Sequence, residues 1–195
     1  MSPTVSDVLL SVLPTLGKQQ LVPAGSMLFR RGEKPDRMFW ALEGELRLVR
    51  TTAGGEGVVL QRCRSGLLAE GSLFSERYHC DGMAAVDTTL IAIARTRFLA
   101  AFSDPEFARA YAQWLSGTIR ELRSNCERLS LRRAPSRIEH YLEEHGCFDC
   151  GRGQGSLKDW AIQLGLTHES LYRTLAAMEA AGRIVREDGS VRLVD

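Results

Sequence analysis

Short runs of apolar residues, bounded by glycine, aspartate or proline, fill the chain between about residues 20 and 103. The runs lie at 27–32, 38–44, 45–50, 58–63 and 83–94, and a glycine-rich turn at 52–57 separates two of them. Runs of this length with such boundaries are typical of antiparallel strands, and they predict a β sandwich or roll. Residues 5–16 have the pattern of a short amphipathic helix, which we expect to pack on the outside of the strands.

A helical repeat replaces this pattern from Pro105 onward. Six uncharged residues recur at alternating spacings of four and three, which predicts one continuous helix of about 25 residues with a heptad seam. Two interpretations are open: a helix packed on its own β domain, or a two-stranded coiled coil. The polar seam residues favour the coiled coil, and hence a homodimer, because a buried polar pair specifies register and partner number. The seam consists of Tyr111, Leu115, Thr118, Leu122, Asn125 and Leu129.

The segment 131–136 predicts a hinge between a sensor half and a reading half of the chain. Pro135 lacks the amide hydrogen that a helix interior needs. Ser136 is a favourable N-cap for a following helix over residues 137–146.

A helix-turn-helix is predicted from residue 156 onward. Ser156 and Asp159 have the spacing of a weak capping box, and Thr167 is placed to cap a second helix. Between the two helices, Gly165 provides a left-handed turn, and Ala161 is small enough for the helices to cross closely. The expected shared core consists of Trp160, Leu164, Leu166, Leu171 and Leu175.

Two alternating runs at the C-terminal end flank the dipeptide Asp188-Gly189. This dipeptide favours a type I′ turn, so the runs predict a hairpin that forms the wing of a winged helix-turn-helix. The whole pattern predicts an α+β chain. Its expected parts are a jelly-roll-like antiparallel β-roll sensor domain at 1–103, a dimerisation helix at 104–131 and a DNA-binding domain at 132–195.

The outer face of the second helix carries the residues that we expect to contact DNA. Arg173 can bind guanine O6 and N7 with two hydrogen bonds, and Glu169 can accept one from cytosine N4. Alternatively, the two residues form only a surface ion pair, since they lie four positions apart. The predicted DNA-binding residues are Thr167, His168, Glu169, Ser170, Tyr172 and Arg173, with Thr167 and Ser170 at phosphates.

Composition adds little to the predicted fold and function. Residues 132–195 contain 9 Lys and Arg against 10 Asp and Glu, so positive charge must be concentrated on one face for DNA binding. The first positive charge is Lys18, and no run is long and apolar enough to span a bilayer, which predicts a cytoplasmic protein. Five cysteines, an odd number, do not suggest a secreted disulfide framework.

The chain resembles the CRP/FNR family of regulators over nearly its full length. The residues that carry the resemblance are PAGSMLFRRG at 23–32, ALEGELRLV at 41–49, LAEGSLF at 68–74 and LGLTHESLYRTLAAMEAAG at 164–182. Glu169 and Arg173 fall on the positions where the family reads a TG-containing half-site. The resemblance therefore implies a homodimer on palindromic double-stranded DNA, DNA bending and contact with RNA polymerase.

The resemblance also identifies the segment where family members hold cyclic AMP. Glu70 stands at the position of the family's ribose-binding glutamate, but Ala69 replaces the preceding glycine. Cys80 and Asp81 replace the arginine and serine that hold the cyclic phosphate. Since a phosphate would meet a carboxylate here instead of a guanidinium, we expect a signal other than cyclic AMP.

The effector and any cofactor stay unassigned. Family members that sense through an iron–sulfur cluster carry their cysteines near the N-terminus, and this chain has no cysteine before Cys63, which excludes that mechanism. Haem-binding relatives take Cys and His ligands from this part of the roll, but their spacing differs from that of His79 and Cys80. Glu70, His79, Cys80 and Asp81 form a candidate effector pocket, either as a metal site or around a reactive Cys80 thiolate. The alternative is that Cys80 is buried filler and that its neighbours make turn hydrogen bonds.

A second cysteine motif, His145-x-Cys147-x-x-Cys150, could bind zinc or respond to redox conditions. A single CxxC pair is a weak signal, because a fourth ligand would have to come from Cys126 or His140. The alternative is two thiols in a loop, and we assign no metal site.

Two other classes of function are alternatives to a regulator. One is a ligand-binding interaction module whose winged helix contacts protein rather than DNA. The other is an enzyme, which is disfavoured because His168 and Glu169 lack a second histidine at zinc-hydrolase spacing and no nucleophile elbow or phosphate loop is present. We assign no catalytic residue.

Overall fold

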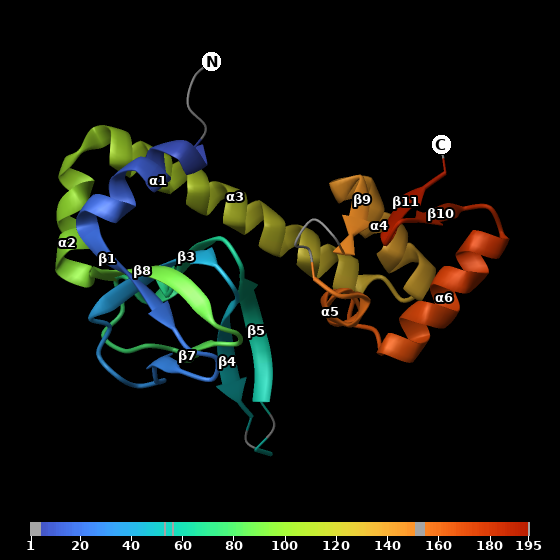
Figure 1. The fold of residues 1–195 in the computed structure, drawn as a ribbon, viewed down its shortest axis with the longest axis horizontal. Coiled ribbons are helices and arrows are strands. Elements are labelled where there is room, and N and C mark those ends of the chain that lie inside the picture. Colours follow the sequence, from blue (N-terminus) through green and yellow to red (C-terminus); the bar gives the residue numbers. More distant parts are fainter. Residues whose placement is uncertain (1–4, 53, 56, 151–154, 195) are drawn as a thin grey trace. The chain divides into compact units, whose positions relative to one another are not determined.

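The computed structural model describes residues 5–52, 54–55, 57–150 and 155–194. The chain forms two compact units, Met1–Leu115 and Ser116–Asp195. An antiparallel β-roll, a long helix and a winged helix-turn-helix follow one another along the chain, so the predicted α+β class is confirmed (Figure 1).

The first unit is a roll of two four-stranded antiparallel sheets with strand orders β1-β8-β3-β6 and β2-β7-β4-β5. Its helical segments are α1 (Val5–Leu16), η1 (Glu70–Ser72), α2 (Arg95–Ala100) and η2 (Ala101–Ser103). Its strands are β1 (Gly17–Val22), β2 (Met27–Phe29), β3 (Arg37–Glu43), β4 (Leu46–Thr51), β5 (Gly57–Cys63), β6 (Gly66–Leu68), β7 (Asp81–Ala84) and β8 (Thr88–Ala94).

The two sheets enclose one apolar core. Alternate residues of β4 are buried, as the period of two in a half-buried strand requires, whereas β8 has Leu90, Ile91 and Ile93 all buried. The predicted single run at 83–94 is in fact two strands, because the chain turns at residues 85–87 and passes from one sheet to the other. The predicted helix at 5–16 is confirmed as α1, whose Leu9 and Leu13 are buried in this core.

The long helix α3 (Pro105–Ser130) begins where the sequence pattern changes and has about the predicted length. Its first turns belong to the core of the roll, where Phe107, Ala110 and Tyr111 are buried. Tyr111 packs edge-to-face against Phe98 and Phe102. At these turns the helix therefore packs on its own β domain, which was the first of the two interpretations of the seam.

The second unit contains the rest of α3 and the C-terminal elements. The helices are α4 (Ala134–His145), α5 (Leu157–Gln163) and α6 (His168–Ala180), and the strands are β9 (Cys147–Asp149), β10 (Ile184–Glu187) and β11 (Ser190–Leu193). The strands form an antiparallel sheet in the order β10-β11-β9. The core joins residues from all three helices to the sheet: Ile138, Tyr141, Leu142, Phe148, Trp160, Ala161, Leu164, Leu171, Leu175, Met178, Ile184 and Val191.

Local turn chemistry in this unit is as predicted. Ser156 and Asp159 form a complete capping box at the start of α5, and the Thr167 hydroxyl accepts a hydrogen bond from the Ser170 amide at the start of α6. Gly165 has a φ of 63°, in the left-handed region. Asp188 and Gly189 both have positive φ, as a type I′ hairpin turn requires.

The predicted start of α4 is wrong. The helix begins at Ala134 rather than Arg137, and its N-cap position is Arg133, so Ser136 caps nothing. Pro135 lies in the first helical turn, where its fixed φ is favourable and its missing amide hydrogen is not needed. Only Leu131, Arg132 and Arg133 lie between α3 and α4.

Candidate nucleic-acid interface and effector site

The exposed face at the start of α6 carries four of the predicted DNA-contacting side chains. His168, Glu169, Tyr172 and Arg173 are all exposed, while Leu171 on the opposite face is fully buried in the core. The His168 and Tyr172 rings lie edge-to-face, with their centroids 4.4 Å apart. The two aromatic side chains thus contact each other beside the charged residues.

Glu169 and Arg173 form no ion pair with each other or with any other residue that the structure describes. The alternative of a surface ion pair is therefore not realised in this structure. Both charged groups keep their hydrogen-bonding capacity for an external partner. A guanidinium offers donors in a fixed planar fork, and a carboxylate offers acceptors only.

The two predicted phosphate-contacting residues have structural roles as well. Thr167 is exposed and caps α6, whereas Ser170 is half-buried and its carbonyl accepts a hydrogen bond from the Thr174 hydroxyl. The positive end of the α6 dipole lies at the same place, which favours an anion there.

Arginines of the wing are partly neutralised by nearby glutamates. Arg186 lies 3.6 Å from Glu179, and Arg192 lies 3.8 Å from Glu187. Both distances are long for an ion pair, so these arginines can turn to another anion at small cost. The wing therefore carries two weakly paired cations.

The seam of α3 has two parts with different surroundings. Tyr111 is buried in the roll and Leu115 packs against the same core. Beyond them Leu122 and Leu129 are about half exposed, as is Ile119, which the heptad analysis missed. Thr118 is half-buried, and the Asn125 side-chain oxygen accepts a hydrogen bond from Arg128 of the same chain. A partly exposed apolar stripe therefore runs along the second part of α3.

In the predicted effector pocket, Cys80 is buried and its neighbours make hydrogen bonds within the roll. The Cys80 side chain is only 1% exposed, and burial raises the pKa of its thiol. His79 Nδ1 lies 2.9 Å from the Ser72 hydroxyl oxygen, and an Asp81 oxygen accepts a hydrogen bond from the Arg31 amide. These contacts fit the alternative of buried filler with turn hydrogen bonds, and a raised pKa disfavours a reactive thiolate.

The remaining pocket residue, Glu70, has a buried carboxylate oxygen with no hydrogen-bond partner among the described residues. Burial raises the pKa of this carboxyl. Burial and the nearby Glu70 together raise the pKa of Tyr111 to about 12. Ala69, which stands where the family has glycine, has a φ of 77° and so keeps the left-handed conformation in spite of its side chain.

The second cysteine motif is spread over a helix end and a strand. His145 stacks on the Tyr141 ring and has its Nδ1 2.9 Å from the Tyr141 carbonyl oxygen. Cys147 is half-buried in β9, and Cys150 is exposed just beyond it. Within the described segments, three or more histidine, cysteine or acidic side chains do not gather anywhere in a group suited to a metal ion.

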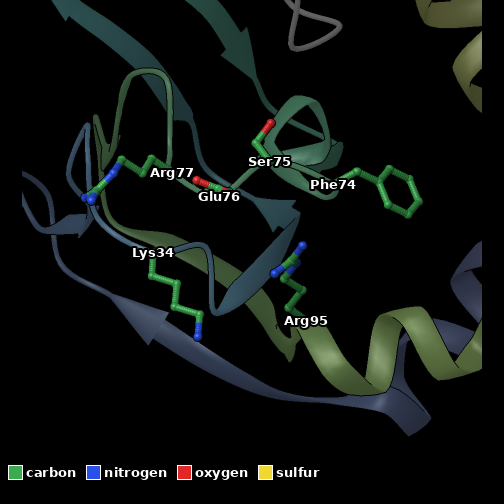
Figure 2. A pocket seen from close by; sticks show the side chains of 6 residues that line it. All are labelled: Lys34, Phe74, Ser75, Glu76, Arg77 and Arg95. Atoms are coloured by element: carbon green, nitrogen blue, oxygen red, sulfur yellow. The ribbon is translucent and has the colours of Figure 1, made fainter.

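A surface hollow of about 420 Å³ opens beside α2 in the first unit. Figure 2 shows Phe74 and Arg77 pointing in opposite directions from the segment that carries them, with Lys34 and Arg95 on other segments. Arg77 donates to the Gly32 carbonyl, and Arg95 donates to a backbone carbonyl beside Phe74. The side chains do not converge on a point, and the residues of the predicted effector pocket do not line this hollow.

Three arginines with several polar contacts were not predicted from the sequence. Arg128 is only 2% exposed and Arg137 is half-buried. Neither carries a local signal, because arginine on a helix is ordinarily a solvent-exposed residue. Arg50 was missed as well; it donates to the His79 carbonyl and is the cation that acts on Cys80.

Known proteins are similar to this chain in sequence and in fold. Residues 19–104 match the family model described as the cyclic nucleotide-binding domain. A cyclic AMP receptor protein of Thermus thermophilus is 27% identical over 206 aligned positions, which cover 99% of this chain and 89% of that protein. The crystal structure of the Thermus thermophilus catabolite activator protein aligns with a TM-score of 0.52 and 25% identity, covering 95% of this chain and 89% of the other.

Two further structures share the fold at lower identity. A CRP/FNR-family transcriptional regulator from Thermus thermophilus has a TM-score of 0.59 and 24% identity, covering 91% of this chain and 94% of its own. A CooA variant from Carboxydothermus hydrogenoformans has a TM-score of 0.73 and 16% identity, covering 100% of this chain and 93% of its own.

Residues 19–104 thus match the cyclic nucleotide-binding domain, and a long helix and a winged helix-turn-helix follow them along the chain. The chain is similar in sequence to a cyclic AMP receptor protein and in fold to CRP/FNR-type transcription regulators. Of the helices in the described segments, not one has both the length and the apolar character needed to cross a membrane.

Proposed function

We propose that the chain is a homodimeric transcription regulator that binds a palindromic site in double-stranded DNA. The observation that carries the proposal is the exposed face of α6, where Glu169 and Arg173 are unpaired and Leu171 anchors the opposite side in the core. Arg173 would bind a guanine and Glu169 a cytosine, with His168 and Tyr172 beside them. Thr167, Ser170 and the start of α6 would hold phosphates.

The dimer would form through the second part of α3. Ile119, Leu122 and Leu129 are about half exposed along one helix, and a second copy of the same stripe would cover them. Each dimer would then present two reading helices to two inverted half-sites. DNA bending, contact with RNA polymerase and a cytoplasmic location are parts of the same proposal that follow from similarity to CRP/FNR-type regulators.

The signal would be something other than cyclic AMP. The residues at the family's phosphate-binding positions are a buried thiol, Cys80, and a carboxylate, Asp81, which already accepts a hydrogen bond from the Arg31 amide. We expect the affinity for an operator to be unchanged when cyclic AMP is added in a titration. A large increase in affinity on adding cyclic AMP would contradict this part.

Selection from a library of random duplexes tests DNA reading directly. We expect the purified wild-type protein to enrich an inverted repeat, and Arg173→Ala to lose preference at one base pair per half-site. The loss should be about 1–3 kcal/mol of discrimination at that base pair. Arg183→Ala is the matched control, because Arg183 is an exposed arginine of the same unit that pairs with Glu139.

The control should leave base preference unchanged at every position. If the wild-type protein enriches no sequence and shifts no duplex at low salt, DNA reading by α6 is wrong. That result would favour the alternative in which the winged helix contacts protein.

A further inference from the structure

Arg137 joins two segments of the second unit through hydrogen bonds to backbone carbonyls. Its Nε donates to the Leu131 carbonyl at 2.7 Å, and its Nη2 donates to the Leu129 carbonyl at 3.2 Å. Its Nη1 donates to the Leu164 and Gly165 carbonyls, both at 3.0 Å. One guanidinium thus binds the end of α3 on one side and the turn of the helix-turn-helix on the other.

The chemistry of helix ends explains why a guanidinium suits this place. α3 ends at Ser130 and α5 ends at Gln163, and the last carbonyls of a helix have no partners within the helix. These carbonyls also carry the negative end of the helix dipole, which favours a cation. Arg137 provides a permanent charge and a planar set of donors, which can serve two helix ends at once.

Gly165 lets the guanidinium come close to the turn. A Cβ atom added at Gly165 would lie 2.9 Å from Arg137 Nη1 and 2.8 Å from a Leu129 methyl carbon. The turn therefore has its left-handed glycine at the place where α3 and Arg137 pack against it. The contact between the helix-turn-helix and the end of α3 is direct and has no room for another side chain.

Arg128 forms a second link, between α3 and α4. Its side chain is 2% exposed, donates to Asn125 and Glu144 at 2.8 Å each, and lies 4.9 Å from the centroid of the Tyr141 ring. The Ser124 hydroxyl also donates to the Glu144 carboxylate. The segment predicted as a hinge is thus crossed by two buried or half-buried arginine networks.

We propose that Arg137 is a positioning residue that sets the angle between the second part of α3 and the helix-turn-helix, and with it the half-site spacing that the dimer accepts. The proposal rests on the proposed function, because it assumes a dimer that pairs along α3 and reads DNA with α6. If α3 is the dimer seam, the angle between α3 and α6 fixes the separation of the two reading helices. That separation must match one turn of the double helix, about 34 Å, or a multiple of it.

A set of duplexes with identical half-sites and stepwise spacers tests this role. Affinities are measured for wild type, Arg137→Gln, Arg137→Lys and Arg132→Gln, at a temperature well below each protein's measured unfolding midpoint. Arg132 is the matched control, since it is an exposed arginine of the same linker with no hydrogen bond or ion pair to another described residue.

We expect wild type and Arg132→Gln to prefer one spacing over its one-base-pair neighbours by about tenfold or more, in the range that separates good sites from poor ones. In Arg137→Gln this preference should fall to about threefold or less, and Arg137→Lys should not restore it, because one ammonium cannot reach carbonyls on both sides together. Base preference within each half-site should stay as in wild type in all three variants.

The outcomes separate this role from a purely structural one. If Arg137→Gln binds more weakly by one factor at every spacing, or if Arg137→Lys behaves as wild type, positioning by the guanidinium is wrong. If wild type binds an inverted repeat and both Arg137 variants keep its spacing preference, the positioning role is wrong and the proposed function stands. If wild type reads no DNA sequence, the proposed function fails and the spacing role fails with it. Arg137→Lys also provides a folded comparison should Arg137→Gln be unstable.

Discussion

Cys80 illustrates how burial of one side chain limits its chemistry. The thiol is covered by the core of the roll and its pKa is raised, chiefly by burial. A raised pKa means less thiolate at neutral pH, and the thiolate is the form that attacks an electrophile or binds a metal. The same residue in an exposed loop next to His79 would have been a plausible sensor.

Thiol labelling tests this conclusion. In the native protein we expect a disulfide reagent to modify exposed Cys150 at least about 100-fold faster than Cys80, since burial shields the Cys80 thiol and raises its pKa. Peptide mapping after timed quenching assigns the rates to each cysteine. In denaturant the two rates should become similar. Equal rates in the folded protein would show that Cys80 is accessible and would restore the thiol-sensor interpretation.

The connection between α3 and α4 is held by hydrogen bonds that the predicted element boundaries did not indicate. Proline and serine in 131–136 predict a hinge, yet α4 begins within that segment, and Arg137 binds the Leu129 carbonyl before it and the Leu164 carbonyl after it. The strength of this connection depends on backbone groups at helix ends. It also depends on Gly165, which gives Arg137 the room to approach them.

Substitution of Gly165 should reveal the close contact. Gly165→Ala should lower the free energy of unfolding by more than the roughly 1–2 kcal/mol that a left-handed φ costs a residue with a side chain, because its Cβ also meets Arg137 and Leu129. Gly182→Ala is the matched control, since Gly182 has a φ of 69° but no atom near its Cβ position. Denaturant unfolding of both variants checks the difference. Equal losses would mean that the packing at Gly165 contributes nothing.

At the scale of the whole molecule, α3 has two tasks. Its first turns complete the core of the roll through Phe107 and Tyr111, and its second part leaves an apolar stripe uncovered. A stripe of this kind on a helix is typical of a surface that pairs with a partner. The proposed dimer therefore depends on the residues from Ile119 onward, and Tyr111 contributes indirectly through the roll.

Introducing a charge into the stripe tests the dimer. Leu122→Asp should make the protein monomeric in sedimentation experiments and abolish sequence-specific DNA binding, because two carboxylates would be buried against each other at the seam. Val86→Asp is the control, since Val86 is a similarly exposed apolar residue in the roll. The control should stay dimeric. A Leu122→Asp protein that sediments as a dimer would place the interface elsewhere.

The sequence by itself determined the features that depend on neighbouring residues. The capping box at Ser156, the cap at Thr167, the left-handed Gly165 and the Asp188-Gly189 turn were all predictable, because each places a side chain or a permitted φ within a few residues of the group that it serves. The resemblance of these motifs to a known family then gave the order of the domains and the candidate reading residues.

Tertiary structure alone decided which groups meet across long stretches of chain. Arg137 binds a carbonyl 27 residues away, the run at 83–94 divides between two sheets, and Cys80 and Tyr111 enter a core assembled from distant strands and helices. Residue spacing has no signal for such contacts, because they depend on the packing of whole elements and on which backbone carbonyls that packing leaves unsatisfied.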